Sequence, residues 1–140
     1  MKKKRNVKQS KKHQIFIQGW GTLNNETLVC VGCEHKEVIA FAKKNKIKAE
    51  AITWLEHHFS TLPEHPSTTG YTISDVSGTF LWLREYEDSW DYWETLIHEI
   101  SHMLDFVFED RKMTKETEAR AYQHEYLFRQ IRRKLQGLAK

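Results

Sequence analysis

The sequence predicts a single α+β domain, and three observations predict it. Two short segments near the N-terminus, residues 15–18 and 27–31, are apolar and of strand length, the second rich in β-branched residues. Residues 71–75 and 79–84 are two more strand-like segments, separated by a Ser-Gly turn signal that indicates an antiparallel hairpin. A long stretch with helical patterns closes the chain, from residue 90 to residue 135.

Length and composition set the limits of this domain. The chain has 140 residues, which suits one domain with a sizeable core, and we place that domain at residues 13–140. Its apolar runs are far shorter than the ~20 residues that a membrane span needs. No hydrophobic segment directly follows the basic N-terminus, as it would in a signal peptide. We therefore expect a cytoplasmic protein that has no membrane partner.

The positive charge of the chain is concentrated at its N-terminus. Residues 1–12 contain seven lysines and arginines and no acidic residue, whereas the whole chain has a net charge of only +3. The basic character therefore belongs to a tail, and the rest of the chain is net acidic. We expect a disordered, solvated tail, with nucleic-acid contact through this tail as the alternative.

The sequence between the two strand regions predicts two helices and a loop. Apolar residues recur at helical spacing in residues 34–44 and again in residues 48–59. Residues 60–69 hold both prolines and several small polar residues, which predicts a loop.

Two longer helices are expected after the hairpin. Asp88 or Ser89 is a suitable N-cap for a helix at residues 90–108. Thr114 is the N-cap candidate for the last helix, at residues 115–135. The first of these helices is apolar on almost all sides, so we expect it to be buried.

This first long helix carries the motif His98-Glu99-Ile100-Ser101-His102. The two histidines are four residues apart, about 40° around a helix, so both imidazoles can bind one metal ion. Glu99 lies about 100° from His98, beside such an ion, where a general base for a metal-bound water is needed. We predict that His98 and His102 bind one Zn²⁺ with Glu99 as the general base. The alternative is a pair of hydrogen-bonded histidines without a metal.

A catalytic zinc site needs a third protein ligand. Six residues beyond the second histidine, where metzincins have a third histidine, this chain has Phe108. The last helix offers Glu116, Glu118 and Glu125 instead. Uncharged residues that can pack follow Glu118 three and four positions on, whereas the face of Glu116 is more polar. We therefore favour Glu118 as the ligand, with a solvated charge as the alternative. Glu125 lies on the same face further along and is a candidate to support the site without binding the metal itself.

Other polar residues near the motif have more open roles. Asp105 lies close to the histidine face and could orient an imidazole through its second nitrogen, or it is simply a surface aspartate. Tyr122 and Tyr126 could donate a hydrogen bond to an oxyanion, although most such tyrosines only pack. His124 points away from the face of Glu118, and we expect no role for it.

The only two cysteines, Cys30 and Cys33, form the motif Cys-Val-Gly-Cys. A zinc ribbon needs two such pairs, so one pair does not predict a structural zinc site. A redox-active pair stands after a strand, at a helix N-terminus. The position after the strand at residues 27–31 is compatible with this, but the rest of a thioredoxin pattern is missing. We expect ordinary buried or half-buried thiols.

The segment from Trp93 to Asp105, Trp-Glu-Thr-Leu-Ile-His-Glu-Ile-Ser-His-Met-Leu-Asp, is followed by Glu118-Ala-Arg-Ala-Tyr122. Together they resemble the zincin-like metallopeptidases that are common in phage and prophage genomes, within the wider gluzincin clan. The resemblance covers roughly residues 70–130. It implies a minimal zincin-like fold, in which a small antiparallel or mixed sheet packs against the His-Glu-x-x-His helix and a following C-terminal helix.

The same resemblance implies the roles of the site residues. It makes His98, His102 and Glu118 the zinc ligands and Glu99 the base. It also implies a peptide or protein substrate that pairs as an extended strand with the strand before the helix, here residues 79–84 (Thr79 to Arg84). The resemblance does not imply a particular substrate.

Three functions follow from these expectations. The first is a zinc peptidase of the gluzincin type that hydrolyses a peptide bond. The second is a zinc-binding zincin-like protein without turnover, such as a phage or regulatory binding module. The third is a DNA-associated protease like the SprT group, whose tail would bind DNA. Glu99 favours the first, because a purely structural zinc site does not need it. The third is weakened because that group uses a third histidine and often a zinc ribbon.

Overall fold

The computed structural model describes residues 12–62, 69–75 and 78–137 and confirms the α+β class. Its elements are, in chain order, β1 (Gln14–Gly19), β2 (Glu26–Val31), α1 (His35–Lys44), α2 (Ala49–Phe59), β3 (Gly70–Asp75), β4 (Gly78–Leu83), α3 (Trp90–Asp110) and α4 (Thr117–Leu135). Each element lies within two residues of its predicted range. Most of the predicted tail, the centre of the predicted loop and the Ser-Gly turn position 77 lie outside the described residues.

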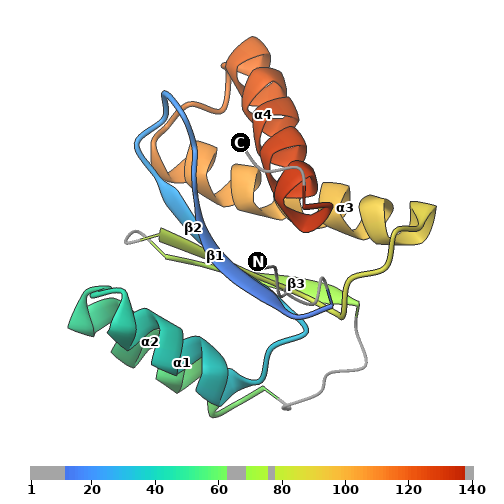
Figure 1. Cartoon of the computed structure of the whole chain (residues 1–140). Coiled ribbons are helices and arrows are strands. Elements are labelled where there is room, and N and C mark those ends of the chain that lie inside the picture. The colour runs from blue at the N-terminus through green and yellow to red at the C-terminus, as the bar shows by residue number, and fades with distance from the viewer. Residues whose placement is uncertain (1–11, 63–68, 76–77, 138–140) are drawn as a thin grey trace, which may run out of the picture.

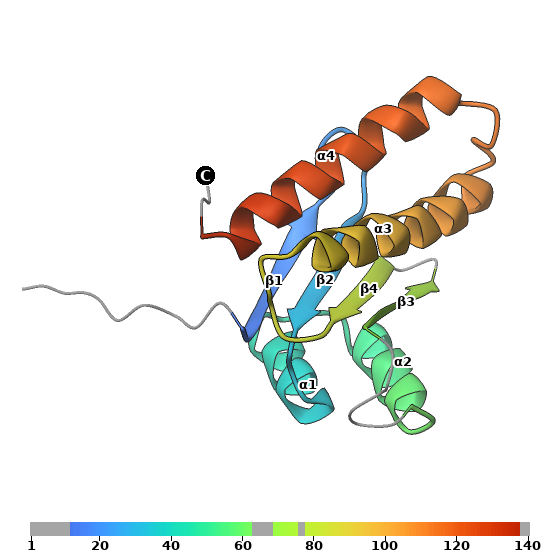
Figure 2. The same cartoon turned by 90° about the vertical axis from the view of Figure 1, so that its right-hand side faces the viewer.

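The four strands form one mixed sheet in the order β1-β2-β4-β3. β1 pairs with β2 and β3 pairs with β4 in antiparallel fashion, while β2 and β4 are parallel. Parallel neighbours need a long crossover connection, which here contains α1 and α2. Figure 1 shows α1 and α2 against one face of the sheet and α3 and α4 against the other, and Figure 2 shows the same three layers from the side.

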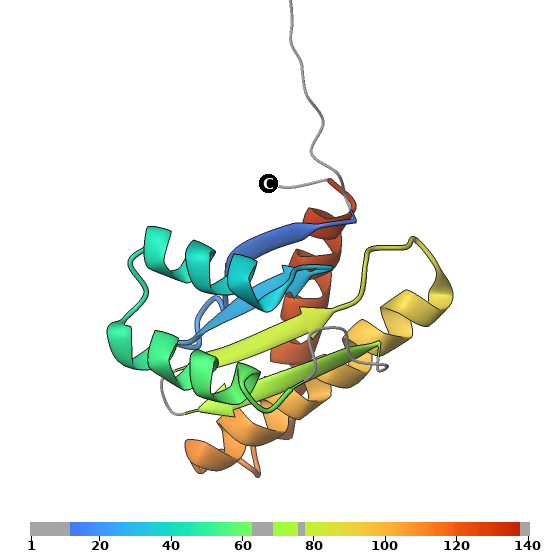
Figure 3. The same ribbon diagram turned by 90° about the horizontal axis from the view of Figure 1, so that it is seen from below.

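The strand order corrects one expectation about substrate binding. The strand predicted to pair with a peptide, residues 79–84, corresponds to β4, whose two neighbours are β2 and β3. A strand that is paired on both sides has no free backbone groups for a third partner. The end strand of the described sheet on this side is β3, and it lies beside α3, as Figure 3 shows from below.

Alternating side chains divide the core into two layers. In β4, Leu81 and Leu83 pack in the cluster formed with α3 and α4. Phe80 and Trp82, on the other face of the same strand, pack in the cluster formed with α1 and α2. Each such side chain contributes roughly 1.5–3 kcal/mol on burial. Because a slip by one residue would exchange the two sets, this pattern fixes the register of β4.

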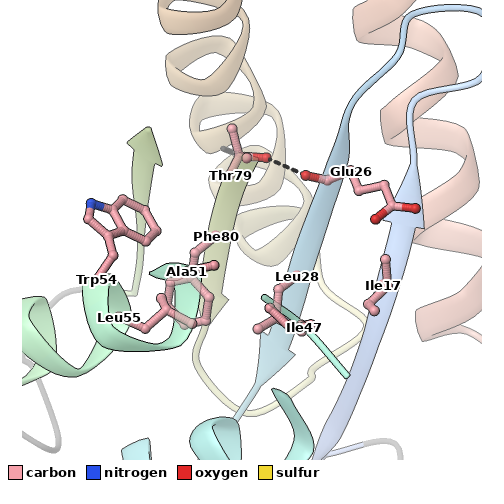
Figure 4. Close-up of a pocket in the computed structure, with 10 residues that line it drawn as sticks. Ile17, Glu26, Leu28, Ile47, Ala51, Trp54, Leu55, Thr79 and Phe80 are labelled. Carbon is pink, nitrogen blue, oxygen red and sulfur yellow. Dashed lines mark hydrogen bonds between the residues drawn. The ribbon is translucent and has the colours of Figure 1, made fainter. Parts of the chain in front are cut away.

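An apolar pocket opens between α2 and the sheet. Leu28 and Phe80 line it from the sheet, and Trp54 and Leu55 line it from α2 (Figure 4). α2, which lines this pocket, covers the face of the sheet opposite α3 (Figure 1). The pocket is therefore separate from the histidine pair.

Local side-chain contacts fix the start of α3. Of the two predicted N-caps, Ser89 caps the helix, because its side-chain oxygen accepts a hydrogen bond from the backbone nitrogen of Tyr92 at 3.3 Å. The N-cap of α4 is Glu116 rather than the predicted Thr114, and its side chain makes no capping hydrogen bond.

Within the described ranges, no helix is both long and apolar enough to cross a membrane.

Candidate metal centre

The helix α3 buries one face and exposes the opposite one. Leu96 and Ile100 are fully buried against the sheet and α4, whereas His98 and His102 are exposed. The expectation of a helix buried all round is therefore wrong for its outer face. Exposed histidines need no buried partner, so their presence on this helix does not by itself indicate a metal. Only the geometry of the pair can indicate one.

The two histidines converge on one point. Their Nε2 atoms lie 3.0 Å apart, and their rings meet edge to face with centroids 4.6 Å apart. Two imidazole nitrogens on a tetrahedral zinc ion, each ~2.05 Å from it, are about 3.4 Å apart. A change of a few tenths of an ångström in the side chains brings the pair to that distance. The pair thus fits two positions of a tetrahedral zinc site.

Glu99 occupies a different environment from its two neighbours in the motif. It is only 7% exposed, whereas His98 and His102 are exposed. Burial raises the pKa of the Glu99 carboxyl group, and the two nearby imidazoles, His102 more than His98, partly oppose that rise. A carboxyl group whose pKa is raised accepts and returns a proton more readily at neutral pH.

Glu99 and His98 face an open depression between α3 and the start of β3. Its lining residues are Thr69, Arg84, Asp91, Glu94, Thr95, His98 and Glu99. Gly70 permits this arrangement, because a Cβ atom there would lie 3.0 Å from a methyl group of Leu83 and 3.1 Å from a methyl group of Thr95. The hydroxyl oxygens of Thr69 and Thr95 are 3.3 Å apart across the same contact. The edge strand and the candidate base therefore border one depression.

The structure does not bring the predicted third ligand to the pair. Glu118 is exposed in the first turn of α4, and Tyr122, on the same face, is 57% exposed. The predicted inward orientation of this face is not observed. Glu125, further along it, is also exposed and forms an ion pair with Arg129 at 3.2 Å. Within the described parts of the chain, no three His, Cys, Asp or Glu side chains form a metal-binding group.

His124, for which we expected no role, is the histidine that α4 turns towards α3. Its Nε2 lies 3.3 Å from the Ser101 hydroxyl oxygen and 3.2 Å from the Ile97 carbonyl oxygen. Those two residues directly precede the histidines of the motif. The sequence contained a signal for this orientation of His124. The apolar residues Leu127 and Ile131 follow it by three and seven positions, on the same face of the helix, and both are buried in the structure.

Asp105 and the tyrosines have structural contacts of their own. An Asp105 carboxylate oxygen lies 2.8 Å from the guanidinium of Arg120, which joins the outer faces of α3 and α4. The same guanidinium donates a longer hydrogen bond, 3.4 Å, to the Ser101 carbonyl. Tyr122 and Tyr126 stack on one another with ring centroids 6.4 Å apart. Of the two roles left open for each residue, these contacts favour the surface aspartate and the packed tyrosines.

Comparisons with known proteins add no relative to this picture. The chain matches no protein-family model, no curated protein and no solved structure. The geometry of α3 and its motif are therefore the basis for assigning a function.

Proposed function

We propose that this protein is a zinc-dependent metallopeptidase in which His98 and His102 bind the metal and Glu99 is the general base. The observation that carries the proposal is the placement of these three side chains. Two imidazole nitrogens converge to 3.0 Å on the outer face of α3, and the intervening carboxyl group lies beside the edge strand. A zinc site with no catalytic task would have no use for that carboxyl group.

Each protein group has a definite task in the proposed hydrolysis. Zinc, when bound, acts as a Lewis acid that lowers the pKa of a water molecule towards 7. Glu99 would accept a proton from the attacking water molecule and would return it to the leaving amine of the peptide. β3 is the end strand of the described sheet and borders the depression that contains Glu99, so an extended peptide lying along β3 would bring its carbonyl carbon next to this carboxyl group.

Two residues of α4 compete for the third ligand position. Glu118 is the ligand implied by the resemblance to gluzincins, and its use requires the first turn of α4 to move towards the pair. His124 already faces α3, where its Nε2 contacts Ile97 and Ser101, the residues before the two histidines of the motif. We propose Glu118, because a carboxylate at an exposed helix start can move without breaking core contacts, whereas His124 is held by two hydrogen-bond contacts.

Zinc-binding measurements on matched variants decide between the two residues. We expect Glu118→Gln to weaken zinc binding by at least about tenfold, while His124→Gln and the neighbouring control Glu116→Gln stay near wild type. Calorimetric titration of zinc into the metal-free protein measures all three. A loss confined to His124→Gln would assign the ligand to His124 instead.

Peptide cleavage tests the proposed activity itself. The zinc-loaded wild-type protein and Glu99→Gln are incubated with a peptide library, and the products are identified by mass spectrometry. We expect Glu99→Gln to bind one zinc ion and to cleave at least ~100-fold more slowly. The control is Glu109→Gln, which replaces an exposed glutamate near the C-terminal end of α3 and should cleave at the wild-type rate. Equal rates for Glu99→Gln and wild type would refute the mechanism.

A zinc-binding protein without turnover is the second candidate. The observation that favours it is the absence of an assembled three-residue metal group among the described residues. This function predicts stoichiometric zinc binding by His98 and His102 but no cleavage of any library member by the wild-type protein. The two assays above therefore separate the candidates.

A further inference from the structure

The Cys-Val-Gly-Cys motif lies where the central strand β2 passes into α1. Cys30 is the next-to-last residue of β2, and Cys33 directly precedes Glu34, the N-cap of α1. Gly32 between them has a φ of +69°, a left-handed conformation that lets the chain turn sharply here. The pair thus stands between a strand and a helix N-terminus, which is where protein dithiols with redox activity are found.

The two thiols are adjacent and free. Both belong to the same cluster between the sheet and the α1–α2 layer, and neither forms a disulfide. Each thiol shifts the pKa of the other, so the two side chains lie close together. The Cys33 sulfur lies 3.4 Å from the Gln14 carbonyl oxygen and 3.5 Å from the Val31 carbonyl oxygen. Formation of a disulfide bond would bring the two sulfur atoms to ~2.05 Å from one another.

The two thiols differ in access and in acidity. Cys33 is 7% exposed and lines an open depression, whereas Cys30 is fully buried. The interaction with Cys30 lowers the pKa of the Cys33 thiol, and burial raises the pKa of Cys30. Cys33 is therefore the thiol that ionises first and that a small molecule reaches first. An attacking thiol and a protected resolving thiol have these properties.

The rim of this depression is acidic. Three glutamates line it, Glu34, Glu37 and Glu85, together with the guanidinium of Arg84 and the imidazole of His13, whose Nε2 lies 3.0 Å from a carboxylate oxygen of Glu85. A positively charged reagent is attracted to such a rim, and a negatively charged one is repelled. The rim therefore favours cationic disulfides over anionic ones.

We propose that Cys33 and Cys30 form a redox-active dithiol that reduces small cationic disulfides. The Cys33 thiolate attacks one sulfur of the disulfide, forms a mixed disulfide and releases one thiolate, which takes up a proton. Cys30 then loses its proton and attacks the Cys33 sulfur, which forms the Cys30–Cys33 bond and releases the second thiol. The protein is oxidised by two electrons, and the small disulfide is reduced to two thiols.

This site is independent of the proposed peptidase. Its thiols face the α1–α2 layer, whereas His98 and His102 lie on the outer face of α3, beyond the other face of the sheet. The experiment can therefore be carried out on the full chain after EDTA has removed metal ions. Its result does not depend on whether the protein binds zinc.

Oxidation by cystamine, a cationic disulfide, tests the proposal. The reduced full-length protein is mixed with cystamine, quenched with acid at intervals and weighed by mass spectrometry. We expect the wild type to lose two hydrogens and retain no adduct, and Cys30→Ser to retain one cysteamine on Cys33. Cys33→Ser should react at least about tenfold more slowly than Cys30→Ser. Cys30→Ala repeats the trapping measurement in case a buried serine hydroxyl impairs folding.

Several results would overturn the proposal. A wild-type protein that stays reduced under native conditions would exclude a redox-active dithiol. Equal rates for Cys30→Ser and Cys33→Ser would exclude the assigned order of attack. The acidic rim also predicts faster oxidation by cystamine than by the anionic glutathione disulfide, and equal rates would exclude the preference for cationic disulfides.

Discussion

Replacing one histidine of the pair should abolish stabilisation by zinc while leaving the metal-free fold almost unchanged. His102 is exposed on the outer face of α3, where its Nε2 lies 3.0 Å from that of His98. Loss of an exposed hydrogen bond costs about 0.5–1.5 kcal/mol, and alanine recovers a few tenths of that through its helix propensity. The metal-free His102→Ala protein should therefore unfold within ~1 kcal/mol of wild type.

The effect of zinc on the wild type is larger. A ligand at 100 times its dissociation constant stabilises the folded state by ~2.7 kcal/mol. For a domain of this size, unfolding entropies of ~2.1 cal/mol/K per residue convert this to a rise of about 10 °C in the melting temperature. His102→Ala at the same zinc concentration loses a ligand, and its melting temperature should rise by less than ~2 °C.

Thermal unfolding with and without zinc measures both quantities. EDTA-treated wild type, His102→Ala and the control His57→Ala, an exposed histidine on α2, are melted over a series of zinc concentrations. We expect His57→Ala to keep the full zinc-dependent rise. The reasoning fails if His102→Ala keeps that rise as well. It also fails if the metal-free variant loses several kcal/mol, because the pair would then be structural.

Three further predictions concern the surroundings of the site and the core. Because burial raises the pKa of Glu99, its ionised form lowers the stability of the folded protein at neutral pH. In thermal melts of the metal-free protein over a pH series, Glu99→Gln should raise the melting temperature at pH 7 and leave it unchanged below about pH 4, where the carboxyl group is protonated in both states. Gly70→Ala should lower the free energy of unfolding in urea by about 1–3 kcal/mol and slow peptide cleavage, because the new Cβ would lie 3.0 Å from a Leu83 methyl group. The control Gly19→Ala, whose Cβ would meet nothing within 4 Å, should cleave peptides at the wild-type rate. Thr27→Val should lower the free energy of unfolding by about 1–3 kcal/mol in the same urea assay. The Trp20 indole nitrogen donates a 2.8 Å hydrogen bond to the Thr27 hydroxyl, and valine would leave this buried donor without an acceptor. A loss below ~0.5 kcal/mol would contradict this prediction.

Local patterns in the sequence were sufficient to predict the elements. Helical spacing, alternation and turn residues act over a few positions, so the four helices and four strands could be placed to within two residues. The same local geometry predicts that His98 and His102 share one face of a helix, four residues apart. Their Nε2 distance of 3.0 Å confirms that they meet. Everything in the site that depends on one helix was accessible from the sequence.

What needed the tertiary structure is the direction in which each face points. Periodicity shows that Glu118 and Tyr122 share a face of α4, but it does not show that this face is exposed while His124 turns to α3. That rotation depends on how the buried stripe of α4 packs on α3 and the sheet.

The sequence by itself therefore determined a helix that carries a histidine pair and a carboxylate, together with four short strands. Only the tertiary structure decided that β3 is the edge beside that helix, that β4 is enclosed and that Cys30 and Cys33 lie side by side. The physical reason is that strand order and helix rotation minimise the free energy of contacts between residues far apart in sequence, which no short window contains.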